Sequence, residues 1–142
     1  MSSLVGIIDH ELRQPEVQNI VQAQLRRVQM PGSVAQEHTH CIDGFGLAHR
    51  DTGLFANYGT NAPAPDEPIV LLDGEIHNLD ELARKHLPAS RNRSLSSAQL
   101  CSAMLLAKGL DFAAEFNGLF AIVLLEPAKY TLSIITDRYG FR

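Results

Sequence analysis

In the first half of the chain, the pattern of apolar residues predicts a short strand, then a helix, and then further strands. Residues 4–8 form a short apolar run of strand length. From residue 15 to residue 28 apolar positions recur every three or four residues, so we expect a helix with proline in its first turn, ending by Pro31-Gly32. Residues 34–58 lack helical periodicity and are interrupted by glycines, which predicts strands and turns.

The second half begins with a loop and continues with a strand and a helix. Three prolines in residues 60–68 indicate the loop, and the apolar residues 69–72 that follow predict a buried strand. Asn78 stands three residues before Glu81, a capping-box pattern that predicts the start of a helix. Residues 89–95 form a polar stretch and should be another loop.

A further helix and a hairpin complete the predicted elements. Ser96 and Gln99 repeat the capping-box pattern, and Gly109 is the expected C-terminal breaker of the helix that they open. Residues 119–126 and 130–136 are rich in aliphatic and β-branched residues and flank a short turn, as in a β-hairpin. The order of elements predicts an α+β layered fold in which helices cover antiparallel sheet.

Length and composition describe one ordinary globular domain. The chain has 142 residues, 45% hydrophobic and 20% charged, and a chain of this size can bury a core without disulfides or metal. Twelve Lys and Arg against 16 Asp and Glu give a net charge of -4. We therefore expect no basic surface and neither nucleic acid nor an anionic membrane as the main partner.

Targeting signals and a disulfide framework are not expected either. The most apolar stretch, residues 119–125, is seven residues long, whereas a membrane-spanning helix needs about 20. The first residues lack a cationic leader, so we expect a cytoplasmic protein. The cysteines, Cys41 and Cys101, lie in different predicted elements and should remain thiols in a reducing compartment.

Two candidate sites are disfavoured by their spacing. Gly44-Phe45-Gly46 lacks the third glycine and the following helix of a dinucleotide site, so a turn is expected. His38, His40, Cys41 and His49 do not have the spacing of a structural zinc site. A polar loop with an incidental thiol is the favoured interpretation, and no metal is expected.

Five short blocks in order along the chain carry the most information. They are residues 2–7 (SSLVGI), 47–50 (LAHR), 73–78 (DGEIHN), 116–121 (FNGLFA) and 136–142 (TDRYGFR). Together they resemble the glutaminase domain of the asparagine synthetase family, the class II (N-terminal nucleophile) glutamine amidotransferases. The patterns of that family include M-C-G-I-x-G-I, L-x-H-x-R-L, N-G-E-I-Y-N, S-D-x-E, L-N-G-x-F-A and R-D-x-x-G-x-x-P-L-Y.

The resemblance implies a fold and a reaction. It implies a four-layer αββα sandwich of the N-terminal nucleophile hydrolase type, spanning residues 1–142. In that family an amino-terminal cysteine attacks the side-chain amide of glutamine, with its own α-amine as general base. An α-amine with a pKa of about 8 can serve as a base at neutral pH. Ammonia then passes to a second domain that uses ATP.

This sequence departs from the family at the nucleophile and at the carboxylate clamp. Ser2 stands where the family has its cysteine, and a serine alcohol is far less nucleophilic than a thiolate. Met1 precedes Ser2, so the serine amine is held in a peptide bond while Met1 is present. Asp51 stands where the family has the arginine that binds the α-carboxylate of glutamine. Arg50 is one residue away, on the other side of an extended strand.

Further departures affect the oxyanion hole and the residue that would pair with the α-amino group of glutamine. Asp73 replaces the asparagine of the oxyanion hole, and Gly74 remains as a backbone donor. Loss of one such donor typically costs about 10²–10³ in rate. Glu75 keeps a glutamine-binding position, whereas Ser97 stands where an aspartate would pair with the α-amino group. The retained residues are mainly of turn and cap types, so the scaffold is expected to survive without the active site.

Three hypotheses remain open. The first is a non-hydrolysing N-terminal domain of an ATP-dependent amide-forming ligase that resembles asparagine synthetase, β-lactam synthetase or a lasso-peptide cyclase. Its partner would be a downstream or separately encoded ATP-pyrophosphatase domain, which would bind ATP and magnesium, while this domain would need no cofactor. The second is a serine N-terminal amidohydrolase using Ser2, which requires loss of Met1. The third is a stand-alone scaffold or binding module. A homodimer is a further candidate assembly.

Overall fold

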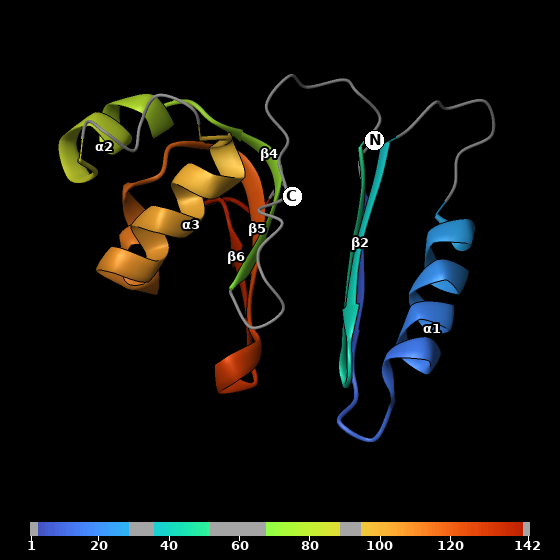
Figure 1. Cartoon of the computed structure of the whole chain (residues 1–142). Helices are drawn as coiled ribbons and strands as arrows, with labels where there is room; N and C mark the ends of the chain where they lie inside the picture. The colour runs from blue at the N-terminus through green and yellow to red at the C-terminus, as the bar shows by residue number, and fades with distance from the viewer. Residues whose placement is uncertain (1–2, 29–35, 52–67, 89–94, 141–142) are drawn as a thin grey trace. The chain divides into compact units, whose positions relative to one another are not determined.

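The computed structural model describes residues 3–28, 36–51, 68–88 and 95–140, which fall in two compact units. The first unit is Met1–Ala56 and the second is Asn57–Arg142. Each unit contains a three-stranded antiparallel sheet with helical structure on one face (Figure 1). The expected α+β class, with helices covering antiparallel sheet, is confirmed. The expectation of one domain stays a prediction.

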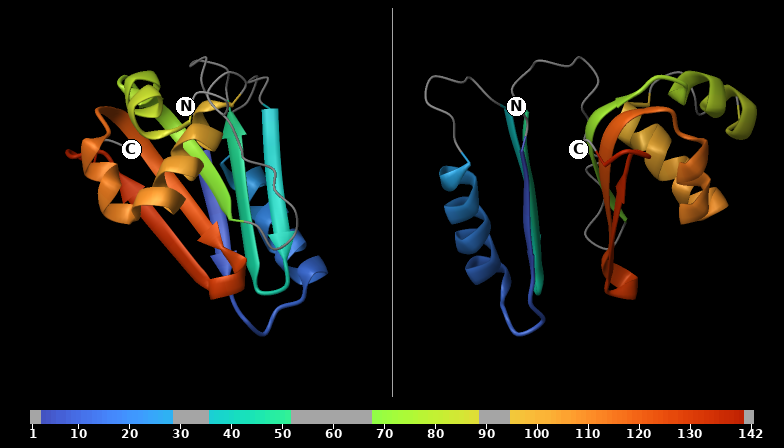
Figure 2. Two further views of the ribbon diagram at one scale, coloured as in Figure 1. Left: turned by 60° about the vertical axis from the view of Figure 1, so that its left-hand side comes forward. Right: turned by 180° about the vertical axis from the view of Figure 1, so that it is seen from behind.

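The first unit is a sheet covered by one helix. Its elements are β1 (Ser3–Ile8), α1 (Gln14–Arg27), β2 (Gln36–Ile42) and β3 (Phe45–Asp51). The strand order is β1-β3-β2, and α1 lies along one face of the sheet in every view (Figures 1 and 2). Val17, Val21 and Leu25 of α1 pack on Ala48 of β3. Gly44, at φ +78°, lies in the β2–β3 turn, so the turn expected over Gly44-Phe45-Gly46 is confirmed at Gly44, whereas Phe45 and Gly46 belong to β3.

The second unit places two helices on one face of its sheet (Figure 2). The strands are β4 (Ile69–Ile76), β5 (Gly118–Glu126) and β6 (Thr131–Thr136), paired in that order. The helices are α2 (Leu79–His86) and α3 (Ser97–Lys108), with 3-10 turns η1 (Leu110–Glu115) and η2 (Pro127–Lys129). The hydrophobic core lies between the helices and the sheet and includes Leu72 and Ile122 from the sheet and Met104 from α3.

The ends of α3 match the sequence prediction. The Ser96 hydroxyl accepts a hydrogen bond from the Gln99 backbone N–H at 3.3 Å, and the Gln99 side chain accepts one from the Ser96 N–H at 2.8 Å. These bonds satisfy donors that the first helical turn would leave unpaired. Gly109 ends the helix at φ +90°, and its N–H donates to the Leu105 carbonyl. Both caps are therefore confirmed.

Two predictions near Asn78 are confirmed in their main content and corrected in detail. Asn78 is the N-cap residue of α2, but its side chain makes no capping bond, because its amide is engaged with Glu115 and Asn117 instead. Residues 69–72 form the predicted buried strand, which continues to Ile76 because residues 73–76 pair with residues 118–121 of β5. The 3-10 turn η1 was not predicted.

Some predicted features lie outside the described residues. They include the helix stop at Pro31-Gly32, most of the loop at residues 60–68 and most of the one at residues 89–95. None of the helices within the described ranges combines the length and apolar character needed to cross a membrane.

Candidate functional site

The predicted site residues are divided between the two units. Ser2 lies outside the described residues. Asp51 is the last residue of β3, where its backbone pairs with Gln36. Asp73, Gly74 and Glu75 follow one another in β4, and Ser97 is the first residue of α3. The second unit therefore contains most of the described candidate residues.

Arg50 is committed to an ion pair within the first sheet. It lies on the face covered by α1, two residues after Ala48, which packs on that helix. Its Nε donates to Glu37 Oε1 at 2.9 Å, and Nη2 contacts the same oxygen. The Arg50 side chain is 6% exposed. Its Nη1 is buried without a hydrogen-bond partner among the described residues, so it is the burial on the α1 face, and not complete pairing, that separates this guanidinium from a substrate carboxylate in solution.

A cavity of about 210 Å³ in the second unit brings three of the predicted positions together. Gly74 and Glu75 line it from β4, and Ser97 lines it from the start of α3. The remaining lining residues come from β4, the turn after it and the start of α2: Leu72, Ile76, His77, Leu79 and Asp80. Asp73 is buried but is not one of the lining residues.

Gly74 and Gly118 allow the backbones of β4 and β5 to approach closely beside this cavity. Gly74 has φ +106°, and a Cβ added there would lie 2.0 Å from the Leu119 carbonyl oxygen. A Cβ added at Gly118 would lie 2.0 Å from the Glu75 carbonyl oxygen. Since no side chain can occupy such a space, both positions require glycine.

Three hydrogen bonds join the turn after β4 to the turn before β5. The His77 N–H donates to the Asn117 carbonyl at 2.7 Å. The Asn78 side-chain amide donates to the Glu115 carbonyl at 2.8 Å, and its oxygen accepts from the Asn117 N–H at 2.9 Å. We call these four residues the clasp. The clasp holds motif blocks 73–78 and 116–121 together and fixes one end of the cavity.

The polar side chains of the cavity are mainly acidic. Glu75 and Asp80 contribute carboxylates, and His77 Nδ1 lies 3.8 Å from Glu75 Oε1. Neither lysine nor arginine is among the described residues that line the cavity. Such a lining favours an ammonium group and disfavours a carboxylate. Sequence reasoning missed His77 and Asp80, although His77 lies within block 73–78.

The two cysteines are not activated as nucleophiles. Burial raises the pKa of the Cys101 thiol in α3 to about 12. Burial also raises the pKa of Cys41 in β2. Reactive cysteines have a lowered pKa, so neither thiol has the properties of the nucleophile used by glutaminases.

The histidines near Cys41 belong to strands instead of the polar loop that was expected. His38 pairs with His49 and His40 pairs with Leu47 in the β2–β3 ladder. Cys41 packs toward α1, on the face opposite to its strand neighbour His40. Among the residues that the structure describes, no three His, Cys, Asp or Glu side chains are grouped to hold a metal ion.

Comparison with known proteins supports the resemblance. Residues 1–142 match the family described as the glutamine amidotransferase domain. Asparagine synthetase [glutamine-hydrolyzing] 1 of Lotus japonicus is 29% identical over 107 residues, which cover 73% of this chain and 17% of that protein. The enzyme of the same name from Arabidopsis thaliana is 28% identical over 97 residues, covering 66% and 16%. The chain thus spans less than a fifth of the length of these relatives. The predicted family and its N-terminal nucleophile fold are confirmed.

Proposed function

Because the chain belongs to the glutamine amidotransferase domain family, we propose that it is a member that has lost glutaminase activity. We further propose that it serves as the structural N-terminal domain of an ATP-dependent amide-forming ligase, of the asparagine synthetase, β-lactam synthetase or lasso-cyclase kind. The observation that carries this proposal is the charge of the substrate-binding positions.

Glutamine is a zwitterion, so a site that binds it needs a cation for its α-carboxylate. The arginine nearest to the clamp position, Arg50, is held by Glu37 under α1. The clamp position itself is Asp51. In the second unit, neither lysine nor arginine is among the described residues that line the cavity with Gly74 and Ser97. An aspartate at the clamp position would repel the α-carboxylate of glutamine and oppose productive binding.

The positions that would stabilise and start the reaction are also unsuited to it. Asp73 replaces an amide donor with a carboxylate, which destabilises a developing oxyanion. Ser2 replaces a thiol with an alcohol. Gly74 is kept, but its close approach to Leu119 explains a glycine there without any catalytic role.

A ligase partner would supply the chemistry that needs ATP. The 142 residues contain no S-G-G-x-D-S phosphate-binding loop, so we assign ATP and magnesium to a separate synthetase domain. That domain would be encoded downstream in the same gene or beside it. The sequence past Arg142, and the neighbouring genes, test this part of the proposal: lack of any ATP-pyrophosphatase domain would favour a stand-alone scaffold.

Ammonia release tests the loss of glutaminase activity. The protein is incubated with millimolar glutamine, with the glutamine-hydrolysing enzyme of Lotus japonicus as positive control. We expect no more ammonia than buffer gives, and protein-dependent formation of glutamate would contradict the proposal. Intact mass after treatment with a glutamine-mimicking electrophile adds a second readout, because an adduct on Ser2 would favour the serine hydrolase instead.

A further inference from the structure

The most exposed large apolar side chains of the described residues gather along one strand, β6. Ile134, within β6, is 68% exposed. Tyr130, which directly precedes the strand, is 69% exposed, and Tyr139, in the turn that follows it, is 73% exposed. The next large apolar residue in order of exposure, Leu119, is 47% exposed. Single exposed apolar residues need no explanation, but a group of them along one element is typical of an interaction surface.

β6 is an edge strand whose outer backbone groups point away from the sheet. The strand order is β4-β5-β6, so within the described residues β6 pairs with β5 alone. The Asp137 N–H donates to the Phe120 carbonyl of β5 at 2.9 Å. Because the direction of the backbone groups alternates along an antiparallel strand, Leu132, Ile134 and Thr136 direct their N–H and C=O groups away from β5. These groups form the outer edge of the sheet.

The outer edge of β6 lacks the features that protect an edge strand from pairing with another chain. Its sequence, TLSIIT, contains neither a charged residue nor proline. By contrast β2, an edge strand of the first sheet, carries Glu37 together with His38 and His40. The edge of β6 is therefore open to a further strand.

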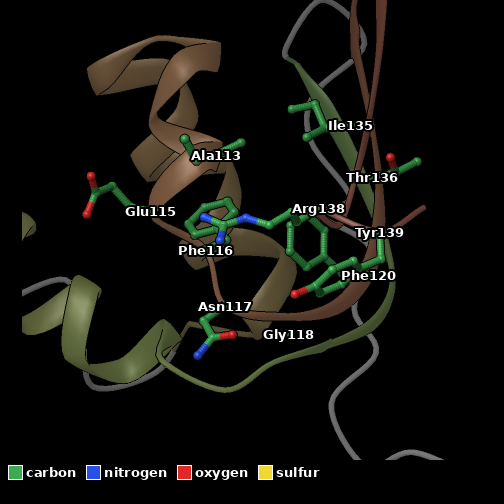
Figure 3. Close-up of a pocket in the computed structure, with 11 residues that line it drawn as sticks. Ala113, Glu115, Phe116, Asn117, Gly118, Phe120, Ile135, Thr136, Arg138 and Tyr139 are labelled. Atoms are coloured by element: carbon green, nitrogen blue, oxygen red, sulfur yellow. The ribbon is translucent and has the colours of Figure 1, made fainter. Parts of the chain in front are cut away.

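The side chains of β6 alternate between the two faces of the sheet. Figure 3 shows Ile135 turned toward Ala113 of η1, where a cavity of about 640 Å³ lies, and Thr136 turned to the opposite side of the strand. Ile135 packs against the core between the sheet and the helices. Ile134 therefore lies on the same face as Thr136, away from that core.

We propose that the outer edge of β6 pairs with the same edge of a second copy of this chain. In an antiparallel pairing about a two-fold axis at Ile134, Ile134 faces Ile134 of the second copy, and Leu132 faces its Thr136. Each facing pair exchanges two hydrogen bonds, so every outward group of these residues is used. A shift of the register in either direction leaves one of them opposite a residue outside β6. The pairing is independent of the loss of glutaminase activity, because no residue of β6 lines the smaller cavity.

A second copy is the favoured occupant because the edge complements itself. The two Ile134 side chains meet on one face and cover apolar surface that each leaves exposed. Antiparallel pairing also places the start of one strand beside the end of the other. The start follows the ion pair of Glu126 and Lys129, and the end precedes Asp137 and Arg138. Each end has one acid and one base, so two copies meet without net repulsion.

Light scattering after size-exclusion chromatography tests the proposal on the full 142-residue protein. We expect a weak dimer, because the paired surface is small: on dilution from millimolar to micromolar protein, the average mass should fall from that of two chains toward that of one. Ile134→Lys places two cations face to face at the two-fold axis and should weaken the dimer at least about tenfold. Leu106→Lys, at an exposed leucine of α3, adds the same charge elsewhere in the unit and should change nothing.

Mixed variants test the register of the pairing. Residue 134 faces itself across the two-fold axis, so an equimolar mixture of Ile134→Lys and Ile134→Glu should recover a dimer that neither variant forms alone. Far-UV circular dichroism reports whether each variant is folded. The proposal is overturned if the protein is a monomer at every concentration, if Ile134→Lys dimerises as well as the unchanged protein, or if Leu106→Lys weakens the dimer equally. A mixture that stays monomeric overturns the pairing about Ile134.

Discussion

The clasp and the β2–β3 ladder keep the family pattern to different degrees. In the clasp, backbone groups and the Asn78 amide meet at fixed distances beside Gly74 and Gly118, and each of these residues matches the family motif. In the ladder, Arg50 is paired with Glu37, and the residue that follows it is Asp51, at the position where the resemblance predicts an arginine. No side chain fits where two backbones approach as closely as they do at Gly74 and Gly118. A charged side chain on a strand, by contrast, can be replaced without changing the strand pairing. This contrast explains how the fold can persist when substrate-binding charges are lost.

The largest expected loss of stability is at Gly74, where β4 and β5 approach closely. Gly74→Ala combines positive φ with a collision between Cβ and the Leu119 carbonyl, so we expect a loss of more than about 3 kcal/mol in the free energy of unfolding. Gly109→Ala is the matched control, because Gly109 also has positive φ but no atom within 4 Å of the added Cβ. It should cost about 1–2 kcal/mol. If urea unfolding gives the same loss for both variants, the positive φ alone requires glycine at Gly74, and the close approach of β4 and β5 does not.

Removing one charge of the Arg50–Glu37 pair should lower the free energy of unfolding more than removing both. Glu37→Leu leaves Arg50 buried beneath α1 without its partner, and we expect a loss of about 2 kcal/mol. The double variant Glu37→Leu/Arg50→Met should recover most of that loss, because a buried pair can often be replaced by apolar side chains at little cost. Urea unfolding of the two single variants and the double variant measures the coupling. Additive losses would mean that the pair does not stabilise the ladder as proposed.

The side chain of Asn78 contributes less, because its hydrogen bonds are partly exposed to water. Asn78→Ala removes two bonds of the clasp and should cost about 1–2 kcal/mol. Asn117→Ala is the matched control, since the described bonds of Asn117 use only its backbone. It should change the free energy of unfolding by less than about 0.5 kcal/mol. A similar loss in both variants would argue against a specific role of the Asn78 amide.

Local patterns predicted the elements well, and the contacts between distant residues poorly. The strands at residues 4–8 and 119–126 and the helix opened by Ser96 follow from apolar spacing and from bonds within one turn. Asn78 has the same local pattern as Ser96, but its amide bonds to residues 37 and 39 positions away. A capping box describes only the first turn, so nothing in that pattern distinguishes the two cases.

The candidate site was predicted in part for the same reason. Motif matching identified Gly74, Glu75 and Ser97, which line one cavity. Its further members, His77 and Asp80, reach it because the turn after β4 and the starts of two helices converge there. That convergence depends on the register of β4 with β5, in which Gly74 pairs with Phe120. Sequence spacing does not give this register.

The smallest expected effect concerns pH and the β2–β3 ladder. Burial lowers the pKa of His40 from 6.5, and its Nε2 is a buried atom without a hydrogen-bond partner among the described residues. Between the lowered pKa and 6.5 the unfolded chain binds more protons than the folded one, so stability rises with pH in that window. The contribution of His40 is complete above about pH 6.5 and is lost as the pH falls through the folded pKa. We expect His40→Gln to flatten the dependence of the urea midpoint on pH between about 5 and 7. If His40→Gln keeps the full slope, the pH dependence arises from groups outside the ladder.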